Sequence, residues 1–199
     1  MIIPGFLVTW ATFPGVIVHE FGHQLMCKLT GTPVREVCYF RLGRTAGYVI
    51  HERPSSTWKH ILIGFGPLIV NSLFGFFLGL IATRPSLHRE DTQLIGGFLV
   101  WLAVSIAMHS FPSRGDAKSL WNALWLEGAP VSSRVVGTPL VVAIYAGAIG
   151  SILWLDLIYG VAVAWWLPQQ LPEAITHALA GITPQDTLNW FGHCAYNFI

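Results

Sequence analysis

Three ionisable side chains share a single turn of the first apolar segment of this chain. The residues at 19–23 read His-Glu-Phe-Gly-His, an HExxH pattern that places two imidazoles at positions i and i+4, on one face of a helix. Two imidazoles on one face can bind a divalent metal ion, and a glutamate between them can reach a water molecule beside that ion. We therefore predict that His19 and His23 are metal ligands and that Glu20 is a general base. The alternative is a hydrogen-bonded polar cluster that seals a helix interface.

A catalytic zinc ion usually has three protein ligands and one open position, so the pattern needs one more residue. Asp116 is our candidate, because it follows the third apolar segment at the end where the first segment also ends. Asp156 lies on the order of 28 Å along the fourth segment if that segment is one straight helix, which places it near the opposite end. Cys27 is one turn beyond His23 and stays open as the fourth ligand of a purely structural site. Reserve ligands at the correct end are His51, Glu52 and His60.

The composition of the 199 residues indicates that membrane helices hold this site. Hydrophobic residues make up 53% and Asp, Glu, Lys and Arg only 11% of the chain, whereas soluble domains contain roughly 25% charged residues. Four segments, at about 3–27, 60–83, 93–111 and 137–167, are apolar over the roughly 20 residues that cross a bilayer. The first of them could instead be a buried core helix or a re-entrant segment. An ordinary soluble globule and a disordered chain are not expected, and the net charge of +1 argues against a nucleic-acid partner.

Lys and Arg are distributed unevenly between these segments. Nine of the eleven lie in the first and third connections, and only Arg84 and Arg89 lie in the second. The positive-inside rule then places the first and third connections in the cytoplasm and the amino terminus outside. We therefore expect a multi-pass protein of the cytoplasmic membrane, with its site toward the cytoplasmic side.

The first connection is predicted to contain a β-hairpin, because 34–40 and 46–51 are rich in β-branched and aromatic residues. The residues from about 168 to 199 are expected to form short interfacial helices. The expected fold is an all-α polytopic membrane protein with about four transmembrane helices, a small β-hairpin in the first cytoplasmic loop and interfacial C-terminal helices. We expect a single domain over 1–199.

With these features the chain resembles the site-2 protease family of intramembrane zinc metalloproteases. The HExxH pattern at 19–23 lies in the first span, and Gly-Pro-Leu-Ile-Val-Asn at 66–71 is similar to a Gly-Pro-x-x-x-Asn segment of that family. Phe-Pro-Ser-Arg-Gly-Asp at 111–116 is similar to the family's Pro-rich segment that ends in an Asp ligand. The chain departs from the family where His109 stands in place of a common Asn and Ala117 in place of a Gly.

The resemblance covers a catalytic core at about 1–125 and implies a zinc-dependent endopeptidase that cleaves membrane proteins or peptides in or near their transmembrane segments. Zn²⁺ held by the two histidines and Asp116 would lower the pKa of a bound water to about 7 and polarise the scissile carbonyl. Glu20 would take the proton of that water and return it to the leaving amine. Asn71 is a candidate donor to the substrate or the developing oxyanion, or alternatively makes a helix–helix hydrogen bond. His109 is a candidate group beside the reacting atoms, or alternatively a packed interfacial histidine.

Two other functions stay open at this stage. The chain could be a catalytically silent membrane protein that keeps zinc for structure or binds a partner helix, although such a site would need no glutamate base. It could also transport metal ions, for which we would expect ionisable residues along several spans. The hairpin likewise has two interpretations, either an edge that holds an extended substrate or a cap on the bundle. The expected partners are the lipid bilayer and a peptide or membrane-protein substrate.

Overall fold

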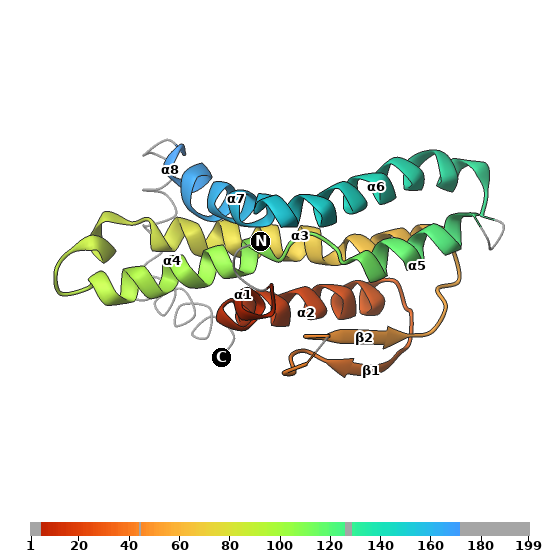
Figure 1. Cartoon of the computed structure of the whole chain (residues 1–199), viewed down its shortest axis with the longest axis horizontal. Coiled ribbons are helices and arrows are strands. Elements are labelled where there is room, and N and C mark those ends of the chain that lie inside the picture. The colour runs from red at the N-terminus through yellow and green to blue at the C-terminus, as the bar shows by residue number, and fades with distance from the viewer. Residues whose placement is uncertain (1–4, 44, 126–128, 172–199) are drawn as a thin grey trace, which may run out of the picture. The chain divides into compact units, whose positions relative to one another are not determined.

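The computed structural model describes residues 5–43, 45–125 and 129–171, which are mostly helical and include one small sheet (Figure 1). In chain order the α-helices are α1 (Gly5–Ala11), α2 (Phe13–Leu29), α3 (Thr57–Ala82), α4 (Gln93–Met108), α5 (Arg114–Trp125), α6 (Val131–Gly150), α7 (Leu155–Val161) and α8 (Leu167–Gln169). The remaining elements are strands β1 (Val34–Cys38) and β2 (Tyr48–His51), the 3₁₀ turns η1 (Pro85–His88) and η2 (Ser151–Leu153), and the π-helical turn η3 (Ala162–Trp166).

Helix α3 is the central element, and α2, α4, α5 and η3 all pack against it (Figure 1). Two of these contacts are close because one helix presents a glycine to the other. A Cβ atom on Gly22 of α2 would lie 2.9 Å from the Cα atom of Pro67 in α3. A Cβ atom on Gly75 of α3 would lie 2.6 Å from the Cβ atom of Ala107 in α4. Larger residues at these glycines would force the helices apart, so the small side chains set the spacing of the bundle.

Two of the four predicted spans correspond to helices that are long and apolar enough to cross a membrane, namely α3 with 26 residues and α6 with 20. Helix α4, at the third predicted span, is apolar but has 16 residues. The first predicted span is not one helix, because α1 ends at Ala11 and α2 begins at Phe13 with Pro14 in its first turn. Proline fits the first turn of a helix but cannot bond to a preceding turn, which explains the interruption there.

The prediction of one continuous helix over 137–167 is wrong. Helix α6 ends at Gly150, the turn η2 follows, and Trp154 has φ = 62° before α7 begins at Leu155. A residue with a Cβ atom in this left-handed region costs roughly 1–2 kcal/mol and cannot continue a right-handed helix. The fourth predicted span is therefore a broken helix.

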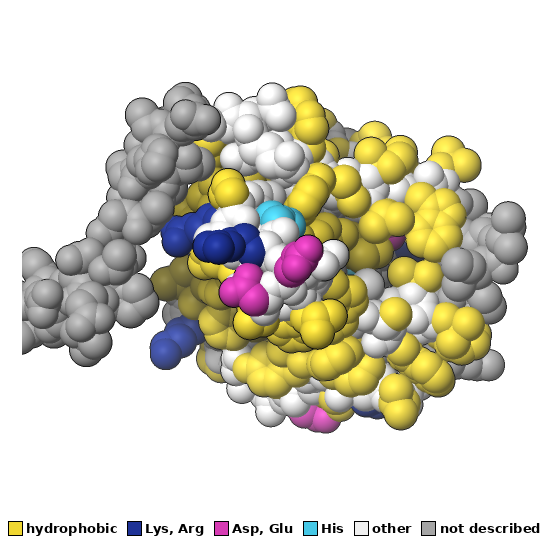
Figure 2. All heavy atoms as spheres, turned by 90° about the vertical axis from the view of Figure 1, so that its left-hand side faces the viewer, with side chains coloured by type: hydrophobic (Ala, Val, Ile, Leu, Met, Phe, Trp, Pro, Cys, Tyr) yellow, Lys and Arg dark blue, Asp and Glu magenta, His cyan; other side chains and the backbone are white. Residues whose placement is uncertain are grey.

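The outward faces of the long helices are apolar. In the view of Figure 2, toward the end where α3 connects to α4, hydrophobic side chains cover most of the described surface around a small group of charged ones. The exposed large side chains of α3 are Trp58, Leu62, Ile69, Leu73, Phe74, Phe77 and Ile81. Those of α4 are Leu94, Ile95, Phe98 and Trp101. Apolar side chains on this scale are too many for an ordinary water-facing surface.

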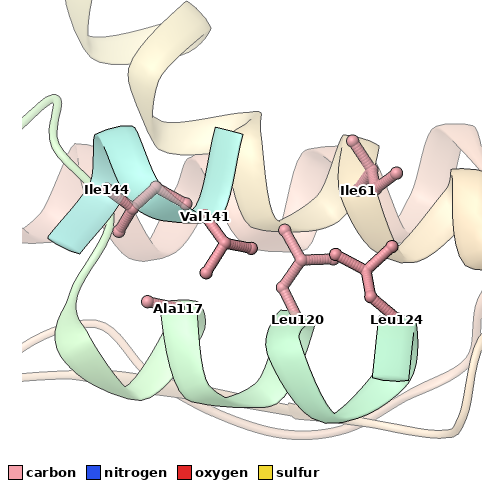
Figure 3. Close-up of a cluster of buried hydrophobic side chains, with 6 residues drawn as sticks. All are labelled: Ile61, Ala117, Leu120, Leu124, Val141 and Ile144. Carbon is pink, nitrogen blue, oxygen red and sulfur yellow. The ribbon is translucent and has the colours of Figure 1, made fainter. Parts of the chain in front are cut away.

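A buried hydrophobic cluster joins α3, α5 and α6 (Figure 3). Leu120 and Leu124 of α5 are fully buried and point between the two longer helices, where they meet Ile61 of α3 and Val141 of α6. Burying a leucine side chain stabilises a fold by roughly 1.5–3 kcal/mol. The cluster therefore fixes α5 in the bundle, together with the residues of its first turn.

The predicted β-hairpin is confirmed. Strand β1 pairs antiparallel with β2, with Cys38 opposite Tyr48 and Val37 opposite Val49. The register shifts between Val34 and Glu36, which marks a bulge. Both strands contact α2 and lie alongside it (Figure 1).

By its internal contacts the chain divides into two units, residues 1–168 and 169–199. The interfacial helices predicted for the C-terminal tail fall almost entirely at 172–199, outside the described residues.

Candidate metal centre

The two histidines of the HExxH pattern meet an aspartate from a distant part of the chain. His19 and His23 lie one turn apart on α2, and Asp116 lies in the first turn of α5. His23 Nε2 is 3.4 Å from Asp116 Oδ1, and His19 Nε2 is 4.0 Å from Asp116 Oδ2. The potential ligand atoms of the three residues all lie within 4.8 Å of one another. The structure thus brings together the three residues that the sequence predicts as ligands.

The position of Asp116 is fixed by a capping box at the start of α5. The Asp116 carboxylate accepts hydrogen bonds from the backbone N–H of Ser113 at 2.7 Å and from its hydroxyl at 2.6 Å. In return, the backbone N–H of Asp116 donates to the Ser113 hydroxyl at 3.2 Å. This reciprocal pairing is favourable at a helix N-terminus because it satisfies N–H groups that have no partner within the helix. It also holds the carboxylate toward the two histidines.

Asp116 supplies the carboxylate of this group. It lies within ion-pair distance of both imidazoles, and the Ser113 N–H and hydroxyl donate to it. An anionic oxygen is the form that a metal ion needs as a ligand.

Backbone carbonyls orient both imidazoles. His19 Nδ1 lies 2.7 Å from the carbonyl oxygen of His109, and His23 Nδ1 lies 2.9 Å from that of Ile63. A carbonyl oxygen can only accept, so each Nδ1 carries the proton and donates it. In the neutral ring Nε2 then keeps its lone pair, and Nε2 is the atom that faces Asp116.

The donor set could hold a metal ion. Two imidazole nitrogens and one carboxylate oxygen converge, and the other nitrogen of each imidazole has a hydrogen-bond partner that orients the ring, as in known zinc sites. Three protein ligands leave the fourth tetrahedral position for water or substrate. Among the described residues no other group of three His, Cys, Asp or Glu side chains has this geometry.

The centre opens into a cavity of about 530 Å³. Glu20 is buried on α2 and lines this cavity together with the three potential ligands. Gly47, just before β2, lies so close that a Cβ atom on it would be 2.6 Å from Glu20 Cγ. The hairpin therefore covers the glutamate directly, and only glycine leaves room for it. The other cavity-lining residues include Tyr48, Val49 and His51 of β2, His60 of α3, Phe111, and Ser119 of α5.

Asn71 is placed away from this cavity. Its side chain is fully buried, and its amide nitrogen donates to the carbonyls of Gly15 in α2 and Ile106 in α4, each at 3.0 Å. Both amide hydrogens are therefore used between helices, and none is left for a substrate or an oxyanion. The predicted catalytic contact of Asn71 is not supported by this geometry, and the helix–helix hydrogen bond is the alternative that fits.

His109 contributes to the centre through its backbone. Its carbonyl oxygen orients His19, while its ring nitrogen Nε2 lies 3.3 Å from the Thr12 hydroxyl. The ring also lines the cavity. His109 thus supports the centre through its own backbone carbonyl and not through its imidazole.

The reserve ligands are not part of the metal centre. His51 and His60 line the cavity with their rings 6.1 Å apart, and His60 Nε2 lies 3.1 Å from the Ser119 hydroxyl. Glu52 pairs with Arg35 on the hairpin at 3.3 Å. Cys27 is completely buried and is not in the group of potential ligands.

Asp156 lines the cavity, which corrects its predicted position at the opposite end. The prediction assumed one straight helix, whereas the break at Trp154 restarts the chain at α7 with Asp156 in the first turn. Its Oδ1 accepts from the backbone N–H of Leu157 at 2.9 Å. The Gly150-Ser151 pair ahead of a charged residue in an apolar segment was the available sequence signal for this break.

Comparisons with protein-family models, with curated proteins and with solved structures find no match to this chain.

Proposed function

We propose that this chain is an integral-membrane zinc metalloprotease that hydrolyses peptide bonds in or near transmembrane segments. The observation that carries the proposal is the convergence of His19, His23 and Asp116 beside a cavity that Glu20 also lines. A site built only for structure would need a fourth protein ligand, and it would need no carboxylate base next to the metal.

Zn²⁺, when bound, supplies a Lewis acid that activates water and polarises the scissile carbonyl. The chain's own residues supply the rest. Glu20 accepts a proton from the attacking water and delivers it to the leaving amine, since it is the acidic side chain next to the ligands on the same helix. The Nδ1–H groups of His19 and His23 donate to carbonyls and so keep both rings facing Asp116.

The free edge of β2 is suited to holding the substrate. The sheet has two strands, and residues of β2 line the cavity whereas residues of β1 do not. A peptide bond is accessible to attack when the backbone is extended, and an extended segment can add to a free strand edge through main-chain hydrogen bonds. The substrate class is therefore a membrane-protein segment that unwinds locally beside β2.

The membrane setting is part of the proposal. Helices α3 and α6 are long and apolar enough to span, and we propose that α1–α2 and α4 complete four crossings. The connection 30–56, which contains four Arg, and helix α5, which contains Arg114 and Lys118, lie toward one end of the helices, and 83–92 lies at the other (Figure 1). The positive-inside rule then puts the hairpin and the metal centre toward the cytoplasm.

The test combines metal content with cleavage on detergent-purified protein. Zinc is measured by elemental analysis, and cleavage with a labelled transmembrane peptide, for wild type, Glu20→Gln, His23→Ala and Asp116→Ala. We expect about one zinc per wild-type chain, and loss of zinc from the His23 and Asp116 variants. Glu20→Gln should keep zinc and lose cleavage by a factor on the order of 10²–10⁴. Glu90→Ala, in the exposed connection after α3, is the matched control and should change neither.

Each contrary result identifies a different failure. If the wild-type protein contains no zinc, the three residues form a hydrogen-bonded polar cluster and not a metal site. Zinc without cleavage of any transmembrane peptide would leave a catalytically silent zinc-binding protein. Full cleavage by Glu20→Gln would remove Glu20 from the mechanism.

A further inference from the structure

A proline interrupts the hydrogen bonding of α3 next to the metal centre. Pro67 lies inside this helix, and proline has no backbone N–H. In an α-helix the N–H of residue i bonds to the carbonyl of residue i−4, so the carbonyl of Ile63 has no partner within the helix. The proline ring also crowds that carbonyl and tilts it away from the helix axis.

The carbonyl left over by Pro67 is the one that His23 uses. His23 Nδ1 lies 2.9 Å from the oxygen of Ile63, and both residues are buried. The approach is possible because α2 and α3 touch at Gly22 and Gly66: a Cβ atom on Gly66 would lie 2.8 Å from the Cγ atom of Met26 in α2. Without a proline at 67, the Ile63 oxygen would be occupied by its own helix and His23 would compete for it.

His19 is held in a parallel way by a different irregularity. Its Nδ1 partner is the carbonyl of His109, the C-cap residue that follows α4. Carbonyls at a helix C-terminus also lack a partner within the helix. Both imidazoles therefore take their orientation from backbone oxygens that a helix break has released.

We propose that Pro67 is a positioning residue of the metal centre: by withholding a backbone N–H it reserves the Ile63 carbonyl for His23, and this fixes the ring with Nε2 toward the metal. The inference rests on the proposed role of His23 as a ligand. It assigns the Gly66-Pro67 pair a task at the site, in addition to helix packing.

The experiment replaces the proline and measures His23 directly. In Pro67→Ala the new N–H takes the Ile63 carbonyl, and selective ¹⁵N-histidine labelling then reports which nitrogen of His23 carries the proton in metal-free protein. We expect Nδ1–H in wild type and a shift toward Nε2–H in the variant. Zinc affinity, measured by competition with a chelator, should weaken about tenfold, at the lower end of the usual effect of removing a ligand's support. A carbonyl has two lone pairs, so some bonding to His23 persists.

Two further variants separate this effect from a change in helix shape. Pro139→Ala in α6 also removes a proline from a helix interior. Its new backbone N–H would bond the carbonyl of Val135, which is an exposed residue. It should leave the His23 tautomer and the zinc affinity unchanged. An α-hydroxy acid at position 67, which replaces the amide by an ester and so has no N–H and no ring, should restore the wild-type tautomer.

The outcomes are distinguishable from those of the proposed function. If wild type binds no zinc, the proposed function fails, and the tautomer comparison alone decides this inference. If Pro67→Ala keeps the Nδ1–H tautomer and the wild-type zinc affinity, the inference is overturned. It is also overturned if the ester variant behaves like Pro67→Ala.

Discussion

His19 and His23 are oriented by neutral carbonyls, whereas many metal-ligating histidines in proteins use a carboxylate for the same task. A carboxylate partner would make the imidazole more basic, but it would add a buried negative charge to an apolar bundle, where charge is costly. Among the described residues, the carboxylates that act on the two histidines are those of Asp116 and Glu20, and each has its own proposed task at the centre. The use of backbone carbonyls to orient His19 and His23 therefore adds no further charge to the two carboxylates that the proposed chemistry requires.

Gly47 offers a test of how Glu20 is positioned. In Gly47→Ala the added methyl group would lie 2.6 Å from Glu20 Cγ, and 2.9 and 3.0 Å from the carbonyl oxygens of Tyr39 and Cys38, so the glutamate and the hairpin must shift apart. A displacement of this kind costs about 10²-fold in rate when it occurs at a catalytic group. We expect kcat to fall by that order with zinc content unchanged. Gly43→Ala in the same hairpin, where nothing lies within 4 Å, is the control.

A different outcome for Gly47→Ala would point elsewhere. Loss of zinc from this variant would mean that the hairpin supports the ligands. Unchanged cleavage would show that the close approach of Gly47 does not control catalysis by Glu20.

At the level of elements, local patterns in the sequence predict more than long segments do. The HExxH pattern and the Ser113–Asp116 segment depend on spacings of three and four residues, and the structure places both as helical geometry requires. The hairpin was predictable from strand-forming residues on both sides of a turn. The breaks at Thr12 and Trp154 were not, because hydropathy averaged over about 20 residues is insensitive to one residue that leaves the helix. Tryptophan is also an unusual choice for a left-handed backbone position.

The break at Trp154 predicts that Asp156 faces water. In a cysteine-free background, Asp156→Cys should react with a charged, water-soluble thiol reagent at least about tenfold faster than Ile158→Cys, because a thiol reacts as its thiolate and needs a polar environment. Ile158 lies on the same helix, is 60% exposed and belongs to the apolar outer surface. Equal rates in liposomes would mean that α7 presents both positions to the same environment.

The buried amide of Asn71 predicts an effect on stability rather than on catalysis. Asn71→Ala removes two interhelical hydrogen bonds, which we expect to lower the free energy of unfolding by about 1–2 kcal/mol. The measurement is reversible unfolding in mixed detergent and SDS, with half-buried Asn122→Ala on α5 as the control. Cleavage per folded molecule should be unchanged. A large fall in kcat with unaltered stability would restore Asn71 as a substrate contact.

On the scale of the whole molecule, the proposed orientation places the Arg-rich connection 30–56 on the cytoplasmic side and the connection 83–92 outside. Exposed serines on the two sides offer a matched pair for testing this orientation, Ser55 before α3 and Ser86 after it. In intact expressing cells, an impermeant maleimide should label Ser86→Cys, and it should label Ser55→Cys only after the membrane is permeabilised. Labelling of Ser55→Cys in intact cells would reverse the proposed orientation.

The separation of the ligands along the chain has a consequence for synthesis. His23 leaves the ribosome about 90 residues before Asp116, an interval of roughly 5–20 s at ordinary rates of translation. In the proposed membrane setting, the first segment enters the bilayer during that interval with a glutamate and two histidines, and neither the aspartate nor the carbonyl of His109 has yet been made. Such a segment is at its least stable when newly inserted. A chain that stops before Ser113 has no Asp116 carboxylate to face the two Nε2 atoms, and it is the form that membrane quality-control proteases should remove.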